Sequence, residues 1–229
     1  MDVLVGSKPG GADTTESEQA SSDETSIDLE DADSVESNED LAFFRRLALQ
    51  LDELNIYKSG RTQAVLDLCL STNERLGSPV NKDQLSAAVY MHDLGMALVP
   101  PDILNKPSKL SPPEFQIIKN HVEMGSQLLQ KIDGWTDAAE IVKQHHERYD
   151  GSGYPRGLSQ DEIHPGAIII ALADTFYAVT NKRVDRSYKK SLFSAVSLIN
   201  GESGVQFDAD FVEAFNETIR HYYIARKET

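Results

Sequence analysis

Residues 163–180, IHPGAIIIALADTFYAVT, decide the fold class. Apolar side chains occupy nearly every face of this segment when it is drawn as a helix, and such a helix is usually buried. The segment therefore predicts a central helix. One carboxylate, Asp174, interrupts the apolar run. A buried carboxylate is costly unless it binds a cation or accepts hydrogen bonds, so we expect Asp174 to contact either a metal ion or a buried hydroxyl or arginine.

The segments on both sides of this helix also have helical periodicity, with apolar residues three and four positions apart. Ser111, Pro112 and Glu114 form the start signal of a long helix. No segment shows sustained alternation of apolar and polar residues, so the sequence predicts an all-α fold. The additional helices are expected over residues 41–55, 59–76, 81–95, 111–132, 136–147, 189–200 and 208–226.

The acidic residues are concentrated at the N-terminus. Residues 1–40 contain 13 Asp and Glu, a single Lys and no aromatic residue, whereas the whole chain has a net charge of −15. Such a composition buries too little apolar surface to offset the entropy of ordering. We therefore predict a disordered acidic tail over 1–40, a leading helix over 41–55 and one domain over 56–229. The tail could be a solubilising leader or a regulatory arm.

The composition excludes several classes of protein. The net charge of −15 argues against a binder of polymeric nucleic acid, which needs a basic surface. The chain has no apolar run long enough to cross a membrane, and its first residues do not resemble a secretory signal. Cys69 is the single cysteine, so there is no internal disulfide. These features predict a cytoplasmic protein that does not bind membranes.

Four of the six histidines lie in segments that we expect to face the core. They are His92, His121, His145 and His146, and His92 is followed by Asp93. A single buried histidine is usually structural, but four histidines with two aspartates are harder to explain in that way. Imidazole and carboxylate groups together suit a divalent transition metal such as iron, manganese, zinc or nickel. A carboxylate can also bridge two such ions.

The motifs around these residues resemble those of the HD-GYP family. In chain order they are MHDLGMALVPPDILNKPSKLSPPEF, NHVEMG, HHERYDGSGYPRGL and ALADTFYAVT, over about residues 56–215. HHERYDGSGYP is highly specific, whereas a His-Asp pair alone is not. The HD-GYP family consists of HD-superfamily helical domains that hydrolyse cyclic di-GMP. The resemblance therefore implies a metal-dependent phosphodiesterase of bacterial signalling, which produces linear pGpG or GMP.

The resemblance also implies roles for individual residues. His92, Asp93 and Asp174 would bind the first of two metal ions, and Asp93 would bridge to the second, with His92 and Asp93 central to catalysis. His121, His145 and His146 would complete the second site. The substrate-binding residues would be Arg183 and the GYP motif, which comprises Gly153, Tyr154 and Pro155.

Two residues depart from the family pattern. Lys58 stands where the family usually has a histidine ligand of the first metal, three residues before Arg61. A protonated lysine has no lone pair to donate. Met96 stands where the family usually has a phosphate-facing lysine, and Leu54 stands where some members have a glutamate that holds a third metal. We therefore expect one or two metal ions, with the first bound more weakly than the second.

These departures leave two functions open. The chain could be an active cyclic di-GMP phosphodiesterase in which an activated hydroxide attacks the phosphate. It could instead be a degenerate module that binds cyclic di-GMP or contacts proteins such as diguanylate cyclase (GGDEF) domains through the GYP loop. In either case, Lys58 could place its ammonium near Asp93 and Asp174 and substitute for a metal cation, or it could point into solvent.

Overall fold

The computed structural model describes residues 29–53, 60–181 and 190–225, with side chains over 39–53, 60–181 and 190–222. Within these ranges the chain is helical, and extended backbone pairs only in isolated bridges, so the all-α prediction is confirmed. The α-helices are α1 (Leu29–Glu53), α2 (Arg61–Arg75), α3 (Lys82–Met91), α4 (Pro101–Leu104), α5 (Pro112–Lys119), α6 (His121–Leu129), α7 (Thr136–Gln144), α8 (Pro165–Thr180), α9 (Leu192–Gly201) and α10 (Ala209–Ala225). Two 3₁₀ helices are η1 (Leu94–Leu98) and η2 (Gln160–Glu162).

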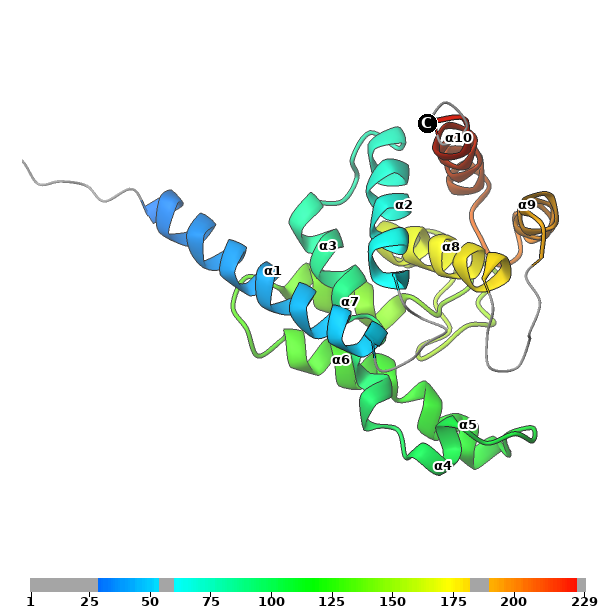
Figure 1. The fold of residues 1–229 in the computed structure, drawn as a ribbon, viewed down its shortest axis with the longest axis horizontal. Helices are drawn as coiled ribbons and strands as arrows, with labels where there is room; N and C mark the ends of the chain where they lie inside the picture. Colours follow the sequence, from blue (N-terminus) through cyan, green and yellow to red (C-terminus); the bar gives the residue numbers. More distant parts are fainter. Residues whose placement is uncertain (1–28, 54–59, 182–189, 226–229) are drawn as a thin grey trace, which may run out of the picture.

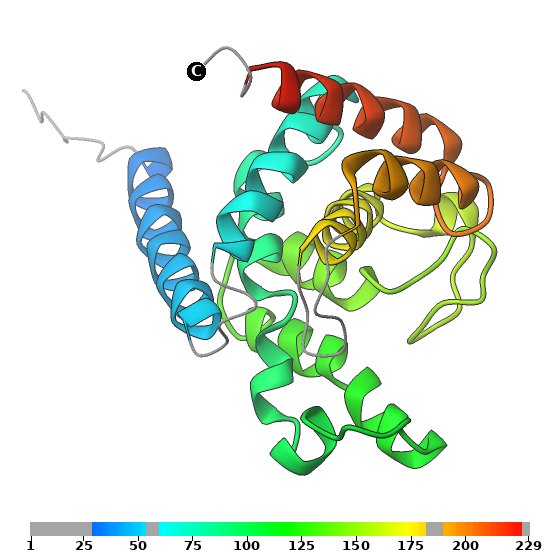
Figure 2. The same ribbon diagram turned by 45° about the vertical axis from the view of Figure 1, so that its right-hand side comes forward.

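Helix α8 is central, as its composition predicts. It packs against α2, α7, α9 and α10, and Figures 1 and 2 show these helices arranged around it. Ile169 and Ile170 have no exposed surface. The helix begins after His164, whose side chain accepts a hydrogen bond from the backbone N–H of Gly166. Because α8 is held from several sides, Asp174 on this helix has a fixed position.

Helix α1 begins earlier than the sequence predicts. It starts at Leu29, within the segment predicted as the acidic tail, and residues 1–28 lie outside the described part of the chain. The last residue of the predicted tail, Asp40, accepts a hydrogen bond from the indole N–H of Trp135 at 2.8 Å. The buried ring of Phe44 meets Trp135 edge-on, with 5.3 Å between ring centroids. These contacts fix α1 to the core. Because a helix elongates more readily than it nucleates, the fixed part accounts for an extension toward Leu29.

The helix predicted over 111–132 is divided in two. Its start is confirmed, because Ser111 and Glu114 form a capping box ahead of α5. Helix α5 ends at Lys119, however, and α6 begins at His121. Helices α4 and α5 project from the body of the molecule (Figures 1 and 2), whereas α6 packs against α7. The apolar periodicity continues through the break, so periodicity alone does not reveal it.

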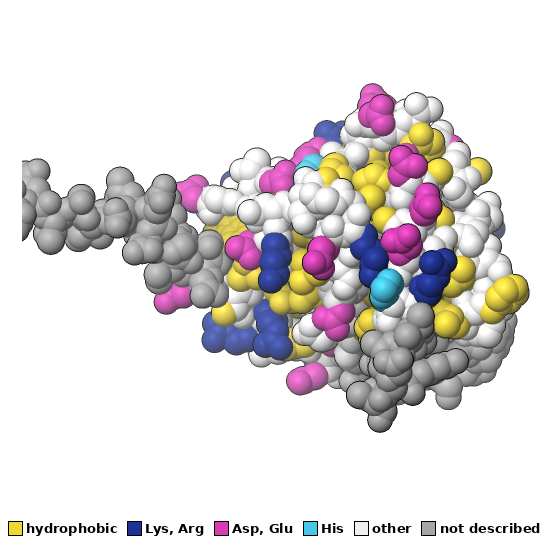
Figure 3. Space-filling view, turned by 90° about the horizontal axis from the view of Figure 1, so that it is seen from above, with side chains coloured by type: hydrophobic (Ala, Val, Ile, Leu, Met, Phe, Trp, Pro, Cys, Tyr) yellow, Lys and Arg dark blue, Asp and Glu magenta, His cyan; other side chains and the backbone are white. Residues whose placement is uncertain are grey.

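The surface seen in Figure 3 has no large patch of one charge. Acidic and basic side chains are interspersed there among polar and apolar ones. This face therefore offers no basic surface of the kind that polymeric nucleic acids require. No helix of the described residues combines the length and the apolar character that crossing a membrane would demand.

Candidate metal centre

Three histidines share one local arrangement, at the end of a helix or at a break between helices. In each ring, Nδ1 lies within hydrogen-bond distance of the carbonyl oxygen three residues earlier. The pairs are His92 with Val89 at 2.7 Å, His121 with Ile118 at 2.8 Å and His145 with Val142 at 2.7 Å. A carbonyl oxygen only accepts, so Nδ1 carries the proton and donates. Each Nε2 therefore presents a lone pair toward the centre of the site.

Two of these rings and a third histidine converge. The donor atoms of His121, His145 and His146 all lie within 4.8 Å of one another. The Nε2 atoms of His121 and His145 are 3.4 Å apart, and both carry lone pairs, so they cannot satisfy each other. Asp93 Oδ1 lies 3.8 Å from Nε2 of His121. Converging imidazole lone pairs beside a carboxylate fit a divalent transition metal ion, although the donor set does not select which one.

The electrostatics of this cluster favour neutral imidazoles. Burial lowers the pKa of His145 well below its usual range, and the neighbouring histidines lower it further. Burial also lowers the pKa of His146 to about 4, with His121 contributing. A histidine binds a metal in its neutral form, so these rings are ready to act as ligands at neutral pH.

The other half of the site is arranged differently, because the guanidinium of Arg61 lies inside it. Arg61 is the first residue of α2, and its Nη1 is 2.9 Å from Oδ2 of Asp93. Its Nη2 is 2.5 Å from Oδ1 of Asp174 and 2.9 Å from Nε2 of His92. An arginine has no acceptor atom, so the Nε2 lone pair of His92 accepts from Arg61.

Arg61 and the carboxylates stabilise each other's charged forms. Burial lowers the pKa of Arg61, but the carboxylates of Asp174 and Asp93 raise it by more, and the result is a higher pKa. Burial raises the pKa of Asp174, but Arg61 outweighs it and leaves that pKa below its usual value. The sequence predicts that Asp174 contacts a metal ion, a buried hydroxyl or an arginine, and the side chain that contacts it here is Arg61.

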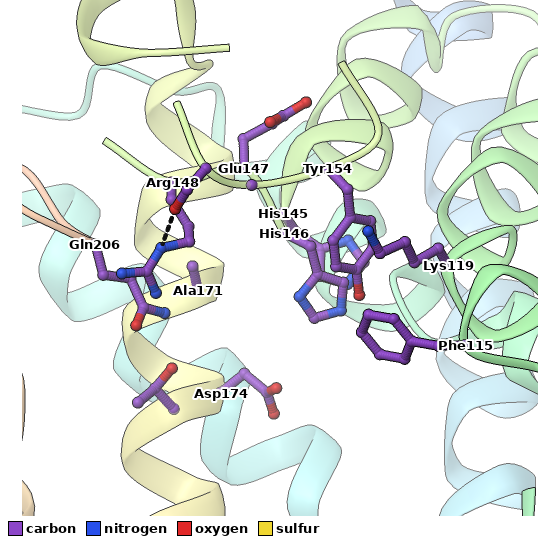
Figure 4. A pocket seen from close by; sticks show the side chains of 13 residues that line it. Phe115, Lys119, His145, His146, Glu147, Arg148, Tyr154, Ala171, Asp174 and Gln206 are labelled. Atoms are coloured by element: carbon purple, nitrogen blue, oxygen red, sulfur yellow. Dashed lines mark hydrogen bonds between the residues drawn. The ribbon is translucent and has the colours of Figure 1, made fainter. Parts of the chain in front are cut away.

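A cavity of about 330 Å³ opens onto both halves of the site. Figure 4 shows His145, His146 and Asp174 at this cavity, with Phe115, Lys119 and Tyr154 on one side and Arg148 and Gln206 on the other. The Lys119 ammonium lies 4.9 Å from the ring centroid of Tyr154 and 5.1 Å from that of Phe115. The pocket thus combines metal-binding groups with two cations and two aromatic rings.

The GYP loop forms one wall of this cavity. The ring of Tyr154 stacks on His146 with 4.9 Å between centroids. A Cβ on Gly153 would lie 2.5 Å from the backbone nitrogen of Arg148, so only glycine allows this close approach. Glu147 is buried and accepts hydrogen bonds from the backbone N–H groups of Arg156 and Leu158. The loop is therefore tied to the same turn that carries the paired histidines.

The comparison with known families agrees with this geometry. A family model described as "HD domain" matches residues 49–211. The chain belongs to the HD domain family. The matching proteins include cyclic di-GMP phosphodiesterases, so the HD-GYP resemblance of its motifs is confirmed.

Relatives of this HD domain are enzymes that act on cyclic dinucleotides. A cyclic di-GMP phosphodiesterase of Thermotoga maritima is 39% identical over 145 residues, which cover 62% of this chain and 39% of the relative. A 3'3'-cGAMP-specific phosphodiesterase 1 of Vibrio cholerae is 32% identical over 182 residues, covering 77% of this chain and 41% of the relative. The chain thus spans less than half the length of these relatives.

Solved structures confirm the fold of the HD domain. A cyclic GMP-AMP-specific phosphodiesterase of V. cholerae superposes with a TM-score of 0.61 at 15% identity, over 79% of this chain and 48% of that one. The HD domain of PgpH from L. monocytogenes, in complex with cyclic-di-AMP, superposes with a TM-score of 0.53 at 16% identity, over 73% of this chain and 90% of that one. At these identities the likeness concerns the fold alone.

The structure brings most of the predicted site residues together. The four histidines, the two aspartates and two residues of the GYP motif meet at or next to the cavity, whereas Pro155 is exposed. Lys58, Leu54 and Arg183 lie outside the described residues. Met96 lies in η1, half-buried, and is not among the residues that line the cavity.

Sequence reasoning missed four residues of this HD domain. They are Arg61, Glu147, Lys119 and Arg148, none of which the sequence predicts to lie at the site. Glu147 and Arg148 directly follow the paired histidines, and that position is the signal that could have identified them. Lys119 could be found only by knowing that the helix breaks after it, which turns its side chain toward the cavity.

Proposed function

We propose that this chain hydrolyses the phosphodiester bond of a cyclic dinucleotide, with cyclic di-GMP as the substrate. The observation that carries the proposal is the convergence of His121, His145 and His146 beside Asp93 on a cavity that also holds cations. When bound there, a divalent metal ion supplies Lewis acidity and makes water a nucleophile at neutral pH. Water then adds to phosphorus as the P–O3′ bond breaks, which gives linear pGpG, and a second cleavage gives GMP.

The residues around the cavity have separate tasks in this reaction. Lys119 and Arg148 supply positive charge for the substrate phosphates, and charged hydrogen bonds to phosphate are among the stronger ones. Phe115 and Tyr154, whose ring centroids are 6.4 Å apart, offer aromatic faces to a guanine base. Asp93 would hold the second-site ion together with the three histidines, and its other oxygen forms an ion pair with Arg61.

The direct test is turnover by the purified chain. Protein loaded with manganese or iron is incubated with cyclic di-GMP, and the linear product is separated by chromatography. We expect pGpG or GMP to form, and a chelator to stop the reaction. If loaded protein with bound metal forms no linear product, the phosphodiesterase proposal is wrong.

A comparison of two cyclic dinucleotides tests which one is the substrate. Both cyclic di-GMP and 3'3'-cGAMP phosphodiesterases occur among the relatives, so the two dinucleotides are compared under the same conditions. We expect the higher kcat/KM with cyclic di-GMP. Faster turnover of 3'3'-cGAMP would support phosphodiester hydrolysis but would show that cyclic di-GMP is not the preferred substrate.

A second candidate function is binding without turnover, and the position of Arg61 favours it. A guanidinium cannot activate water as a metal ion does, so the half-site that contains it lacks one catalytic centre. The chain would then bind cyclic di-GMP, and the exposed Pro155 of the GYP loop would contact a GGDEF domain. Titration with labelled cyclic di-GMP that shows binding without product would support this function. In either case we place the protein in the cytoplasm, where the free thiol of Cys69 stays reduced.

A further inference from the structure

Arg61 is bound by three side chains from three parts of the chain. They are Asp174 on α8, His92 after α3 and Asp93 at the start of η1. The guanidinium side chain is only 10% exposed, and its Nε also donates to Asp174 Oδ1 at 3.2 Å. An imidazole and two carboxylates thus surround the guanidinium cation.

The atoms that hold Arg61 are the same atoms that would hold a first metal ion. Nη2 lies between Nε2 of His92 and Oδ1 of Asp174, at 2.9 and 2.5 Å. A transition metal ion binds such nitrogen and oxygen donors at about 2.0–2.2 Å. An ion shared by these two donors would therefore overlap the guanidinium and meet its positive charge. The metal and the arginine exclude each other at this position.

Within the described residues, no arginine or lysine pairs with the second half-site in this way. Among the residues that the structure describes, the potential metal ligands that converge are His121, His145 and His146, and Oδ1 of Asp93 lies 3.8 Å from Nε2 of His121. The ligand atoms of the three histidines lie within 4.8 Å of one another, and no guanidinium or ammonium group of the described residues pairs with them. The two halves share Asp93, which faces Arg61 with Oδ2 and His121 with Oδ1.

We propose that the Arg61 guanidinium permanently occupies the place of the first metal, so that the chain binds one transition metal ion, held by His121, His145, His146 and Asp93. The inference rests on the proposed function, because it assigns the metal content of the same site. It also agrees with the sequence, since Lys58 replaces a histidine that the family pattern would supply to the first metal. Arg61 is a positioning residue here, and it fixes Asp93 for the single ion.

The test measures metal content and not only activity. The full chain is loaded with manganese, freed of excess ion and analysed by elemental analysis and electron paramagnetic resonance. We expect one equivalent and the signal of an isolated Mn²⁺ ion. Two equivalents with an exchange-coupled signal would overturn the inference, and if the protein still turned over cyclic di-GMP the proposed function would stand.

Two variants show whether Arg61 is the cause. Arg61→Gln and the double variant Lys58→His with Arg61→Gln should raise the content from one toward two equivalents, because they free the donors of His92, Asp93 and Asp174. Arg75→Ala is the matched control, since Arg75 lies on the same helix but pairs with exposed Glu217. We expect the control to keep one equivalent.

The remaining outcomes are equally decisive. A folded Arg61→Gln protein that still binds one equivalent would overturn the claim that Arg61 excludes the first metal. If the Arg61 variants do not fold, the unmodified chain decides alone, because one equivalent supports the inference and two overturn it. No bound metal in the unmodified chain would overturn both this inference and the metal centre of the proposed function.

Discussion

The two halves of the site are built from similar side chains, yet only one of them pairs its carboxylates and imidazole with a cationic side chain from the described part of the chain. In one half, His92, Asp93 and Asp174 surround a cation that the chain itself supplies. In the other half, the ligand atoms of three imidazoles converge, and no cationic side chain of the described residues pairs with them. A set of ligand-type residues therefore does not identify a metal site by itself. What distinguishes the halves is whether another side chain already satisfies the lone pairs.

The largest expected effect comes from removing the half-site of His121, His145 and His146, which we call the open half. Replacing His145 and His146 together by Ala should remove the metal and lower kcat at least about 10³-fold, or about 4 kcal/mol of transition-state stabilisation. His221→Ala is the control, since His221 is an exposed histidine of α10. Turnover assays with metal analysis check this prediction. Unchanged kcat in the double variant would place the reaction elsewhere in the molecule.

Removing the internal cation should instead destabilise the fold. Arg61→Ala leaves two carboxylates without their guanidinium, and breaking a buried ion pair in this way costs about 3–5 kcal/mol. We expect this loss in urea unfolding of metal-free protein. Added manganese should recover part of it, because an ion that binds only the native state stabilises it. A loss below about 1 kcal/mol would show that the stability of the half-site of His92, Asp93 and Asp174 does not depend on Arg61.

Acid should weaken the open half of the metal-free protein. The pKa of His146 is lowered to about 4 in the folded chain, compared with about 6.5 in the unfolded chain. The unfolded state therefore binds more protons between these values, so the free energy of unfolding falls as pH decreases from 6.5 toward 4. This histidine contributes up to about 3 kcal/mol to the fall, at about 1.36 kcal/mol per pH unit.

Urea unfolding at pH 7 and pH 5 measures this effect. The fall between the two values should become smaller in His146→Gln, which cannot be protonated, and should remain in His221→Ala. An equal fall in the unmodified chain and in His146→Gln would show that other groups cause the acid sensitivity.

The cation beside the cavity should affect substrate binding more than chemistry. Lys119→Ala removes one positive charge near the substrate phosphates, and we expect KM for cyclic di-GMP to rise about 10-fold with little change in metal content. Lys131→Ala is the control, since Lys131 is exposed and does not line the cavity. Steady-state kinetics separate KM from kcat. A similar rise in both variants would indicate a general charge effect.

The smallest effect is expected at Met96. Met96→Lys supplies the lysine that the family pattern has at this position, and we expect kcat/KM to rise a few-fold. The gain is small because Met96 does not line the cavity in this structure. If kcat/KM does not change, the η1 turn holds this side chain away from the substrate.

Much of the fold could be predicted from local patterns. The central helix and the capped start of α5 depend on apolar periodicity and on neighbouring residues, which the sequence displays directly. The position of Arg61 could not be predicted, because it contacts Asp174 across 113 residues of sequence. The sequence offered an arginine as one partner for Asp174, but only the packing of α2 against α8 selects it.

The break at Asn120, between α5 and α6, shows the same limit for residues close together in sequence. Residues on both sides continue one apolar pattern, so the sequence predicts a single helix. The structure divides it where η1 packs against α6, and a Cβ on Gly95 would lie 2.2 Å from the carbonyl oxygen of His121. Gly95 allows η1 to approach His121 this closely because it has no side chain. The apolar periodicity of residues 111–132 contains no information about this contact.

The hydrogen bonds from Nδ1 to the carbonyl three residues earlier have a kinetic consequence. Since the backbone itself orients His121 and His145, their rings lose rotational freedom when the helices form and not when an ion arrives. Capture of the proposed ion would then require the ion to shed its hydration water but would need little rearrangement of these two ligands. Its release would require both rings to move together or the adjoining helix ends to unwind. We therefore expect the residence time of the ion to depend on fraying of α6 and α7.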